Sequence, residues 1–290
     1  MTDLSFGVGV PTSAARGDDP AGLAQEAERL GYDFVSAADH PCGSNPSYDT
    51  TTMLTWIAAR TSRIKVASRV LAVPFRRPAM VAKLAASMDL LSGGRFILGL
   101  GGGYSDQEIT ALGGPALSPA EKIDGLAEAI QVIHGAWTQS GFTQDGRHYS
   151  VRGLEMEPKP THPIPVWLGT FGRRALAVTG RLADGWIPSL GYMPVKEIPA
   201  MRHRIDAAAE AAGRRPDQIR SILNLGIRID PDAEPQPDAV TGSARQVVSQ
   251  LQDLLGLGFT GFNFILSGPD RKADMQRIAE DVVPILRSTG

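Results

Sequence analysis

Short strand-like runs alternate with helical segments along the whole chain. The first run covers residues 4–10, and the helix after it begins at Asp18, Asp19 and Pro20 and ends at Gly31. Proline in the first turn and glycine at the end are typical of helices. Two parallel strands pair only when a long crossover, usually a helix, connects them. The alternation therefore predicts a parallel sheet covered by helices.

Eight strand-like runs can be counted, and each is followed by a helix. The other seven runs lie at residues 33–37, 64–73, 96–100, 166–169, 185–188, 219–229 and 261–266. The other helices are expected at residues 50–60, 78–92, 118–137, 173–182, 195–212, 243–255 and 272–286. Eight units favour a closed (β/α)₈ TIM barrel. The alternative is an open doubly wound sheet, whose Gly-x-Gly-x-x-Gly turn is missing after the first strand.

The length fits one such barrel. A chain of 290 residues is close to the roughly 250 residues that a single barrel domain requires. Residues 141–165 interrupt the alternation and are rich in Gly, Pro and polar residues. We interpret them as an irregular insertion, with a short excursion or hairpin, within one domain of residues 1–290.

Composition excludes several classes of partner. The chain has 29 basic and 31 acidic residues without a run of like charges, so nucleic acid is not an expected partner. Cys42 has no second cysteine to pair with, and the first residues lack the pattern of a secretory signal. No apolar stretch approaches the roughly 18 residues that span a bilayer. We expect a cytoplasmic protein that does not enter the membrane.

Asp39 and His40 directly follow the second strand. In a TIM barrel the active site lies at the C-terminal ends of the strands. An Asp-His pair there can hydrogen-bond a flat heterocycle or pass a proton, because imidazole exchanges protons near neutral pH. The alternative is a pair that only caps or orders the loop.

Four glycines lie between Gly99 and Gly103, followed by Tyr104. The run is not a dinucleotide fingerprint, because Tyr104 stands where that pattern requires glycine. Glycines at a strand end let a ligand ring approach the backbone, and a tight turn explains them equally well.

Residues 170–174 read Thr-Phe-Gly-Arg-Arg and precede a helix. Free backbone N–H groups, a hydroxyl and two cations at a helix N-terminus form a plausible phosphate site. Solvated surface arginines are the alternative.

Metal and serine-hydrolase chemistry are not expected. His134, His148, His162 and His203 are not spaced with one another or with Cys42 as in a metal site. No Gly-x-Ser-x-Gly elbow surrounds a serine.

Three segments resemble one known family. Residues 68–114, SRVLAVPFRRPAMVAKLAASMDLLSGGRFILGLGGGYSDQEITALGG, closely resemble the hallmark segment of luciferase-like monooxygenases. FVSAADH at residues 34–40 and PKPTHPIPVWLGTFGRRALAVTGRLADGWIP at residues 158–188 are similar to two further regions of that family. The chain looks most like the branch that uses the deazaflavin coenzyme F420. Relatives that use FMN share the barrel and much of the same amino-acid sequence in these segments.

The resemblance implies a set of site residues. Asp39 and His40 would contact the deazaflavin ring, with His40 near the carbon that carries the hydride. Arg69, Val70 and Leu71 would form a bulge behind the ring, with a cis peptide at Arg69-Val70. The remaining expected cofactor contacts are Gly101, Gly103, Gln107, Gly169, Thr170, Phe171, Gly172, Arg173 and Ser189, with residues 169–173 receiving the phosphate.

The chain departs from the family at Tyr104. Sugar-phosphate dehydrogenases of this family have a proton-donating glutamate there, so that activity is not expected. Tyr104 is either a hydrogen-bond or proton donor, although a phenol is a weak acid at neutral pH, or an aromatic wall of the pocket.

Together these features predict an F420-dependent oxidoreductase that acts on a small organic substrate, with His40 and Tyr104 as catalytic candidates. The loops after the fourth to seventh strands, including residues 141–165, would roof the substrate chamber. An FMN-dependent monooxygenase and a barrel that binds a flavin without turnover are the alternatives. The resemblance also implies a homodimer that pairs through the helices at residues 50–60 and 78–91.

Overall fold

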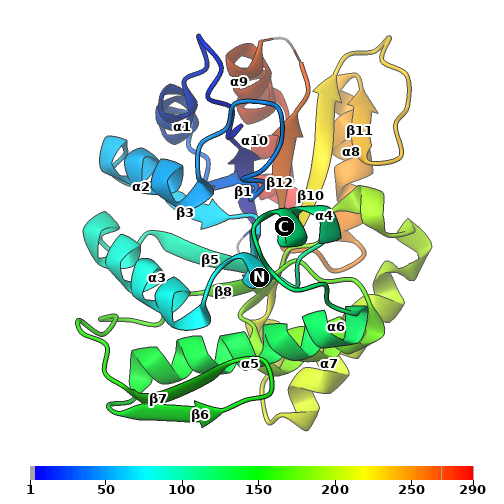
Figure 1. The fold of residues 1–290 in the computed structure, drawn as a ribbon. Helices are drawn as coiled ribbons and strands as arrows, with labels where there is room; N and C mark the ends of the chain where they lie inside the picture. Colours follow the sequence, from blue (N-terminus) through cyan, green and yellow to red (C-terminus); the bar gives the residue numbers. More distant parts are fainter. Residues whose placement is uncertain (1–3, 269, 290) are drawn as a thin grey trace.

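The computed structural model describes residues 4–268 and 270–289 and contains a closed parallel barrel surrounded by helices (Figure 1). Its strands are, in order around the barrel, β1 (Ser5–Gly9), β2 (Phe34–Ala37), β3 (Lys65–Ser68), β5 (Phe96–Gly101), β8 (Val166–Leu168), β9 (Gly185–Trp186), β10 (Arg220–Ile229) and β12 (Gly261–Leu266). Each pairs in parallel with the next, and β12 pairs with β1. The predicted TIM barrel is confirmed.

The helices between the strands begin and end close to the predicted residues. They are α1 (Pro20–Arg29), α2 (Thr50–Arg60), α3 (Pro78–Ser92), α5 (Pro119–Thr138), α6 (Arg173–Leu182), α7 (Ile198–Ala211), α8 (Ala244–Leu255) and α9 (Arg271–Asp281). Asp19 caps α1, and Ser118 with Glu121 forms the predicted capping box of α5. No helix in the described ranges is long and apolar enough to cross a membrane.

Four parts of the chain differ from the predicted elements. The third strand, expected over residues 64–73, is interrupted after Ser68 and continues as β4 (Leu71–Ala72) and a 3₁₀ turn, η1 (Val73–Phe75). The last helix divides near Pro284, which has no N–H to donate, and continues as α10 (Val283–Thr289). Two short elements were not predicted, α4 (Asp106–Ala111) and β11 (Ala239–Gly242), which pairs with β10. Three further 3₁₀ turns are η2 (Leu190–Tyr192), η3 (Val195–Glu197) and η4 (Pro216–Gln218).

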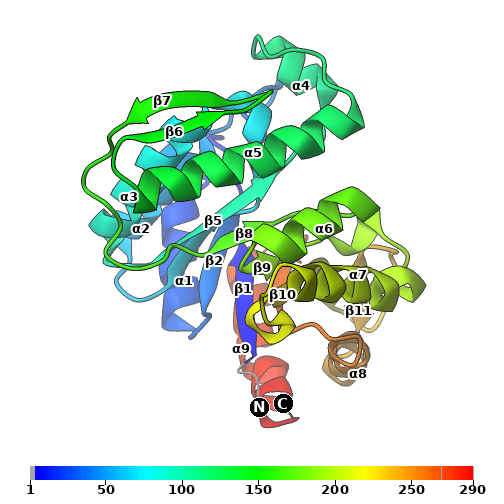
Figure 2. The same cartoon turned by 90° about the horizontal axis from the view of Figure 1, so that it is seen from below.

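The predicted insertion contains an antiparallel hairpin of β6 (Phe142–Asp145) and β7 (Ser150–Leu154). The hairpin lies along α5, on the side away from the barrel strands (Figure 2). The Glu128 carboxylate of α5 accepts hydrogen bonds from the backbone N–H groups of Arg147, His148 and Tyr149. The insertion therefore covers a helix.

The barrel interior is apolar at one level and polar at the next. The apolar level contains Phe34, Ala67, Ile97, Trp167, Ile187 and Ile222, which are all buried. Nearer the C-terminal ends of the strands, Ser36 Oγ donates to Asn263 Oδ1, and Asn263 Nδ2 donates to Asn224 Oδ1, both at 2.9 Å. The apolar level separates the polar level from the N-terminal ends of the strands.

The break in the third strand is a bulge at a cis peptide between Arg69 and Val70, where the resemblance implied one. Glycines on β5 and directly after β8 leave room for the Val70 side chain. A Cβ on Gly101 would lie 2.8 Å from Val70 Cγ2, and one on Gly169 would lie 3.2 Å from the same methyl. A Cβ on Gly99 would collide with the Ser68 carbonyl oxygen. These glycines make space for the bulge.

We therefore predict that alanine substitutions at two adjacent glycines change the free energy of unfolding by different amounts. Gly101→Ala inserts a methyl against Val70 and should lower the free energy of unfolding by about 1–3 kcal/mol. In Gly102→Ala the new Cβ lies 3.4 Å from its nearest neighbour, so the unfolding free energy should stay within about 0.5 kcal/mol or rise slightly. Urea unfolding followed by circular dichroism measures both. Equal losses in the two variants would contradict the packing role of Gly101.

Candidate functional site

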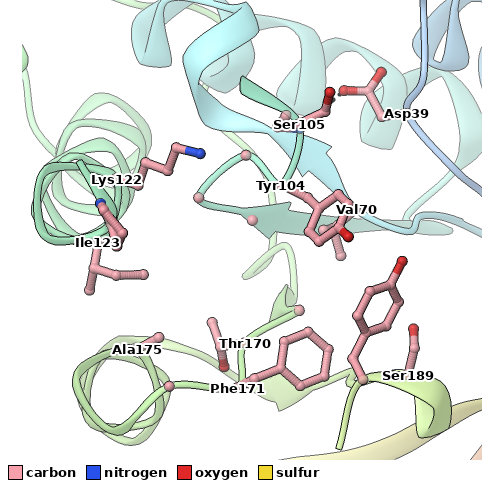
Figure 3. Close-up of a pocket in the computed structure, with 18 of the residues that line it drawn as sticks. Asp39, Val70, Tyr104, Ser105, Lys122, Ile123, Thr170, Phe171, Ala175 and Ser189 are labelled. Atoms are coloured by element: carbon pink, nitrogen blue, oxygen red, sulfur yellow. Dashed lines mark hydrogen bonds between the residues drawn. The ribbon is translucent and has the colours of Figure 1, made fainter. Parts of the chain in front are cut away.

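A cavity of about 760 Å³ opens at the C-terminal ends of the barrel strands (Figure 3). Most of the predicted site residues line it, namely Asp39, His40, Arg69, Val70, Gly101, Gly103, Tyr104, Gly169, Thr170, Phe171, Gly172, Arg173 and Ser189. The fold therefore brings together residues from five separate loops at the position that the sequence predicted.

Two predicted cofactor residues and one predicted loop lie elsewhere. Leu71 is 1% exposed, belongs to the hydrophobic core and does not line the cavity. Gln107 is exposed on α4 and does not line it either. No residue of the 141–165 insertion lines the cavity, so the expectation that this segment roofs the chamber was wrong. The insertion follows α5, which separates it from the mouth.

Asp39 is buried beneath the cavity and is held by an arginine. Arg76 donates to both of its carboxylate oxygens, Nη1 to Oδ2 at 2.7 Å and Nη2 to Oδ1 at 2.9 Å. The backbone N–H of Ala72 donates to Oδ2 at 3.0 Å. Asp39 thus joins the loop after β2 to the chain directly after the bulge, and it positions the bulge.

Arg76 also pairs with Asp49, at 3.1 Å. Burial alone would lower the pKa of the Arg76 guanidinium, but hydrogen bonds and ion pairs with Asp39 and Asp49 outweigh burial and raise it above its usual value. No local sequence pattern points to Arg76, because it lies 37 residues after Asp39.

His40 pairs with a residue that we did not predict. Its Nδ1 lies 3.0 Å from Glu108 Oε2. Because a carboxylate only accepts hydrogen bonds, the pair places the proton on Nδ1 and leaves Nε2 available to a ligand. Glu108 reaches His40 because α4 begins at Ser105, whose Oγ accepts from the Glu108 N–H. The Ser-x-x-Glu spacing at Ser105 was a detectable signal for this helix.

The start of α6 offers unpaired donors to the cavity. Its N-cap residue, Gly172, makes no side-chain cap, so the first N–H groups of the helix lack that partner. Arg174 pairs with Asp124 at 2.6 Å, whereas Arg173 has no ion-pair partner among the described residues. The helix dipole, the free N–H groups and Arg173 together favour an anion.

Thr170 has a structural role in the same loop. Its Oγ1 lies 2.7 Å from Thr179 Oγ1 of α6, and its carbonyl oxygen accepts from Trp186 Nε1 at 2.9 Å. The hydroxyl predicted to meet the phosphate is therefore already hydrogen-bonded within the protein.

Aromatic side chains border the outer part of the cavity. Tyr104 and Tyr192 meet edge to face with ring centroids 5.5 Å apart, and Phe171 lies 5.6 Å from Tyr192. In Figure 3, Tyr104 extends from the loop after β5, and Phe171 extends from the segment that precedes α6. Lys122 also lines the cavity and pairs with Asp106 at 2.6 Å. The observed arrangement favours the interpretation of Tyr104 as a wall.

The site thus combines a supporting bulge, a His-Glu pair and an anion site around one cavity. This combination can hold a planar ligand that carries a phosphate and can exchange a proton with a second ligand. No group of three His, Cys, Asp or Glu side chains that could hold a metal occurs within residues 4–268 and 270–289.

Comparison with known proteins places the chain among related enzymes. Residues 4–248 match the family model of the luciferase-like monooxygenases. A protein of Kribbella flavida named F420-dependent glucose-6-phosphate dehydrogenase is 28% identical over 99% of this chain and 100% of its own length. A protein of the same name from Nakamurella multipartita is 30% identical over 74% of this chain and 64% of its own length.

Solved structures share the fold. An F420-dependent secondary alcohol dehydrogenase in complex with an F420-acetone adduct superposes with a TM-score of 0.87 at 17% identity, covering 98% of this chain and 99% of that one. The F420-dependent tetrahydromethanopterin reductase of Methanopyrus kandleri gives a TM-score of 0.83 at 20% identity, with 98% and 99% covered. The match over residues 4–248 and the shared barrel lead to one conclusion: the chain belongs to the luciferase-like monooxygenase family.

Proposed function

We propose that the protein is an F420-dependent oxidoreductase that transfers a hydride between the deazaflavin and a small organic substrate. The observation that carries the proposal is the meeting of the Arg69-Val70 bulge and the uncapped start of α6 at one cavity. The printed names of the relatives and of two structural neighbours support the choice of F420.

The residues present fit such a cofactor. The bulge and Val70 would support the ring, and the Gly172 and Arg173 end of α6 would take the phosphate. Arg174 and Lys122 also line the cavity, but each is paired with an aspartate. Arg173 is therefore the cation that this side of the cavity offers to the anionic tail of F420. When bound, the deazaflavin supplies the hydride chemistry at its C5 carbon.

His40 and Glu108 would transfer the proton that accompanies hydride transfer. Glu108 fixes the imidazole by accepting from Nδ1, so Nε2 is the atom that gives a proton to, or takes one from, the substrate. Glu108 would thus supply a carboxylate at the site although Tyr104 replaces the glutamate expected after the glycines. Tyr104, Tyr192 and Phe171 would shield the cavity from water.

Titration with the two candidate cofactors tests the proposal. We predict that F420 binds with a dissociation constant at least tenfold below that of FMN, because Arg173 and the free N–H groups at the start of α6 suit the longer anionic tail. Quenching of each cofactor's fluorescence measures both constants on the same protein. Tighter binding of FMN would overturn the proposal in favour of a flavin monooxygenase. Binding of F420 without turnover of any acceptor would favour a barrel that only binds the cofactor.

Substitutions in the His-Glu pair test the proton role. With an aldehyde, ketone or activated alkene that supports turnover, His40→Asn should lower kcat about 100-fold, and Glu108→Leu about 10–100-fold. The matched control is Tyr104→Phe, which keeps the ring and removes the hydroxyl, and it should change kcat by less than about threefold. A loss in Tyr104→Phe as large as that in His40→Asn would assign the proton donor to Tyr104.

We also propose that the protein acts in the cytoplasm as a homodimer paired through α2 and α3. These helices expose Trp56, Met80 and Leu91, at 56%, 65% and 80% of their surfaces, and exposed apolar clusters often mark interfaces. Size-exclusion chromatography with light scattering should give twice the 30.9 kDa chain mass. Leu91→Asp should shift the protein toward monomer, whereas Val195→Asp, an exposed apolar position outside these helices, should not. A wild-type monomer would contradict the proposal.

A further inference from the structure

Arg69 is a cation inside the barrel mouth whose side chain the proposed cofactor site does not explain. It precedes the cis peptide of the bulge, and its side chain runs toward β1, where Nη2 lies 3.7 Å from the point that a Cβ on Gly9 would occupy. Val70 packs toward Gly101 and Gly169 on the neighbouring strands. The two residues of the bulge therefore project toward different parts of the mouth, and Arg69 also lines the cavity.

The guanidinium of Arg69 has no partner among the described residues. Its Nε is buried without a hydrogen bond, and no carboxylate lies within ion-pair distance. Arg95, another partly buried arginine, provides a comparison. Its guanidinium makes five hydrogen bonds, to Ala58, Thr61, Ile64 and Ser92. The isolation of Arg69 is therefore unusual within this protein.

The acids that line the cavity are already engaged. Asp39 is held by Arg76, and Glu108 pairs with His40. The amides of the polar level below, Asn224 and Asn263, hydrogen-bond one another. The protein thus supplies no anion for Arg69.

Burial lowers the pKa of Arg69 to about 10, so the side chain is still a cation at neutral pH. Arg69 is half-buried, with its Nε fully buried, and a partly desolvated charge without a protein partner is costly. Such groups concentrate at functional sites, where a ligand completes the pairing. The phosphate of the proposed cofactor has its own site at Gly172 and Arg173, on the other side of the bulge's Val70. A second anion is required to pair with Arg69.

We infer that Arg69 binds the negatively charged group of the substrate and that this group is a carboxylate. The planar guanidinium fork matches a carboxylate with two parallel hydrogen bonds. This inference rests on the proposed function, since it names the class of molecule that lies beside the cofactor. Arg69 is accordingly a specificity-determining residue, and the protein acts on small organic acids.

Titration calorimetry with carboxylates and their neutral amides tests the inference. Acetate, butyrate and benzoate, each paired with its amide, are titrated into cofactor-free and F420-loaded protein. We expect the wild type to bind at least one carboxylate about ten- to a hundredfold more tightly than its amide. Arg69→Met should remove this preference, and Arg69→Lys should keep part of it.

Two measurements separate this loss from unfolding and from loss of cofactor. Because Met has a similar length and removes a half-buried charge that has no partner among the described residues, ligand-free Arg69→Met should melt at or above the wild-type temperature. Its dissociation constant for F420 should stay within threefold of the wild type. Arg173→Met is the matched control, and it should weaken F420 while leaving the carboxylate preference intact.

Three results would be decisive against the inference. They are a wild type without any carboxylate preference, a preference that survives Arg69→Met, and a loss of F420 binding in Arg69→Met as large as the loss of carboxylate. The last result would assign Arg69 to the cofactor ring. Failure of the wild type to bind F420 would instead overturn the proposed function, and the cofactor-free titration would still test Arg69.

Discussion

The structure of the site depends on the break in the third barrel strand at Arg69-Val70. In a regular strand, the side chains of Arg69 and Val70 would point to opposite faces of the barrel wall. The break is held from two sides. Glycines on β5 and after β8 make room for Val70, and the Asp39 carboxylate binds the Ala72 N–H directly after it. Arg76 neutralises that carboxylate, so the bulge rests on an ion pair that is buried under the cavity floor.

This arrangement divides the cavity into regions with separate tasks. Val70 offers an apolar support, the start of α6 offers N–H groups and Arg173 to an anion, and His40 with Glu108 offers a proton at a fixed nitrogen. Arg69 adds a second cation at a different place in the mouth. Because the two anion sites lie apart, one suits a cofactor phosphate and the other an acidic substrate. Although Tyr104 stands where a glutamate was expected, α4 brings the Glu108 carboxylate to His40.

The sequence predicted those parts of the fold that depend on local patterns. Caps such as Asp19 and Ser118 and the alternation of strands and helices depend on residues close together in the chain, and the structure has them where expected. The bulge at Arg69-Val70 was predicted from the family resemblance. Contacts between distant residues were not predictable in this way. Arg76 reaches Asp39 across 37 residues, and the Asp39 carboxylate faces the bulge. Gln107 was assigned to the cofactor although its neighbour Glu108 is the one that α4 turns toward the cavity.

We propose that one cradle, made of the bulge and the start of α6, holds a deazaflavin. A crystal structure of the protein with F420 bound tests it most directly. We predict electron density for the ring against Arg69-Val70 and for the phosphate at the N–H groups that follow Gly172, with His40 beside the reacting carbon. A ring bound away from the bulge, or a phosphate bound away from α6, would contradict the account.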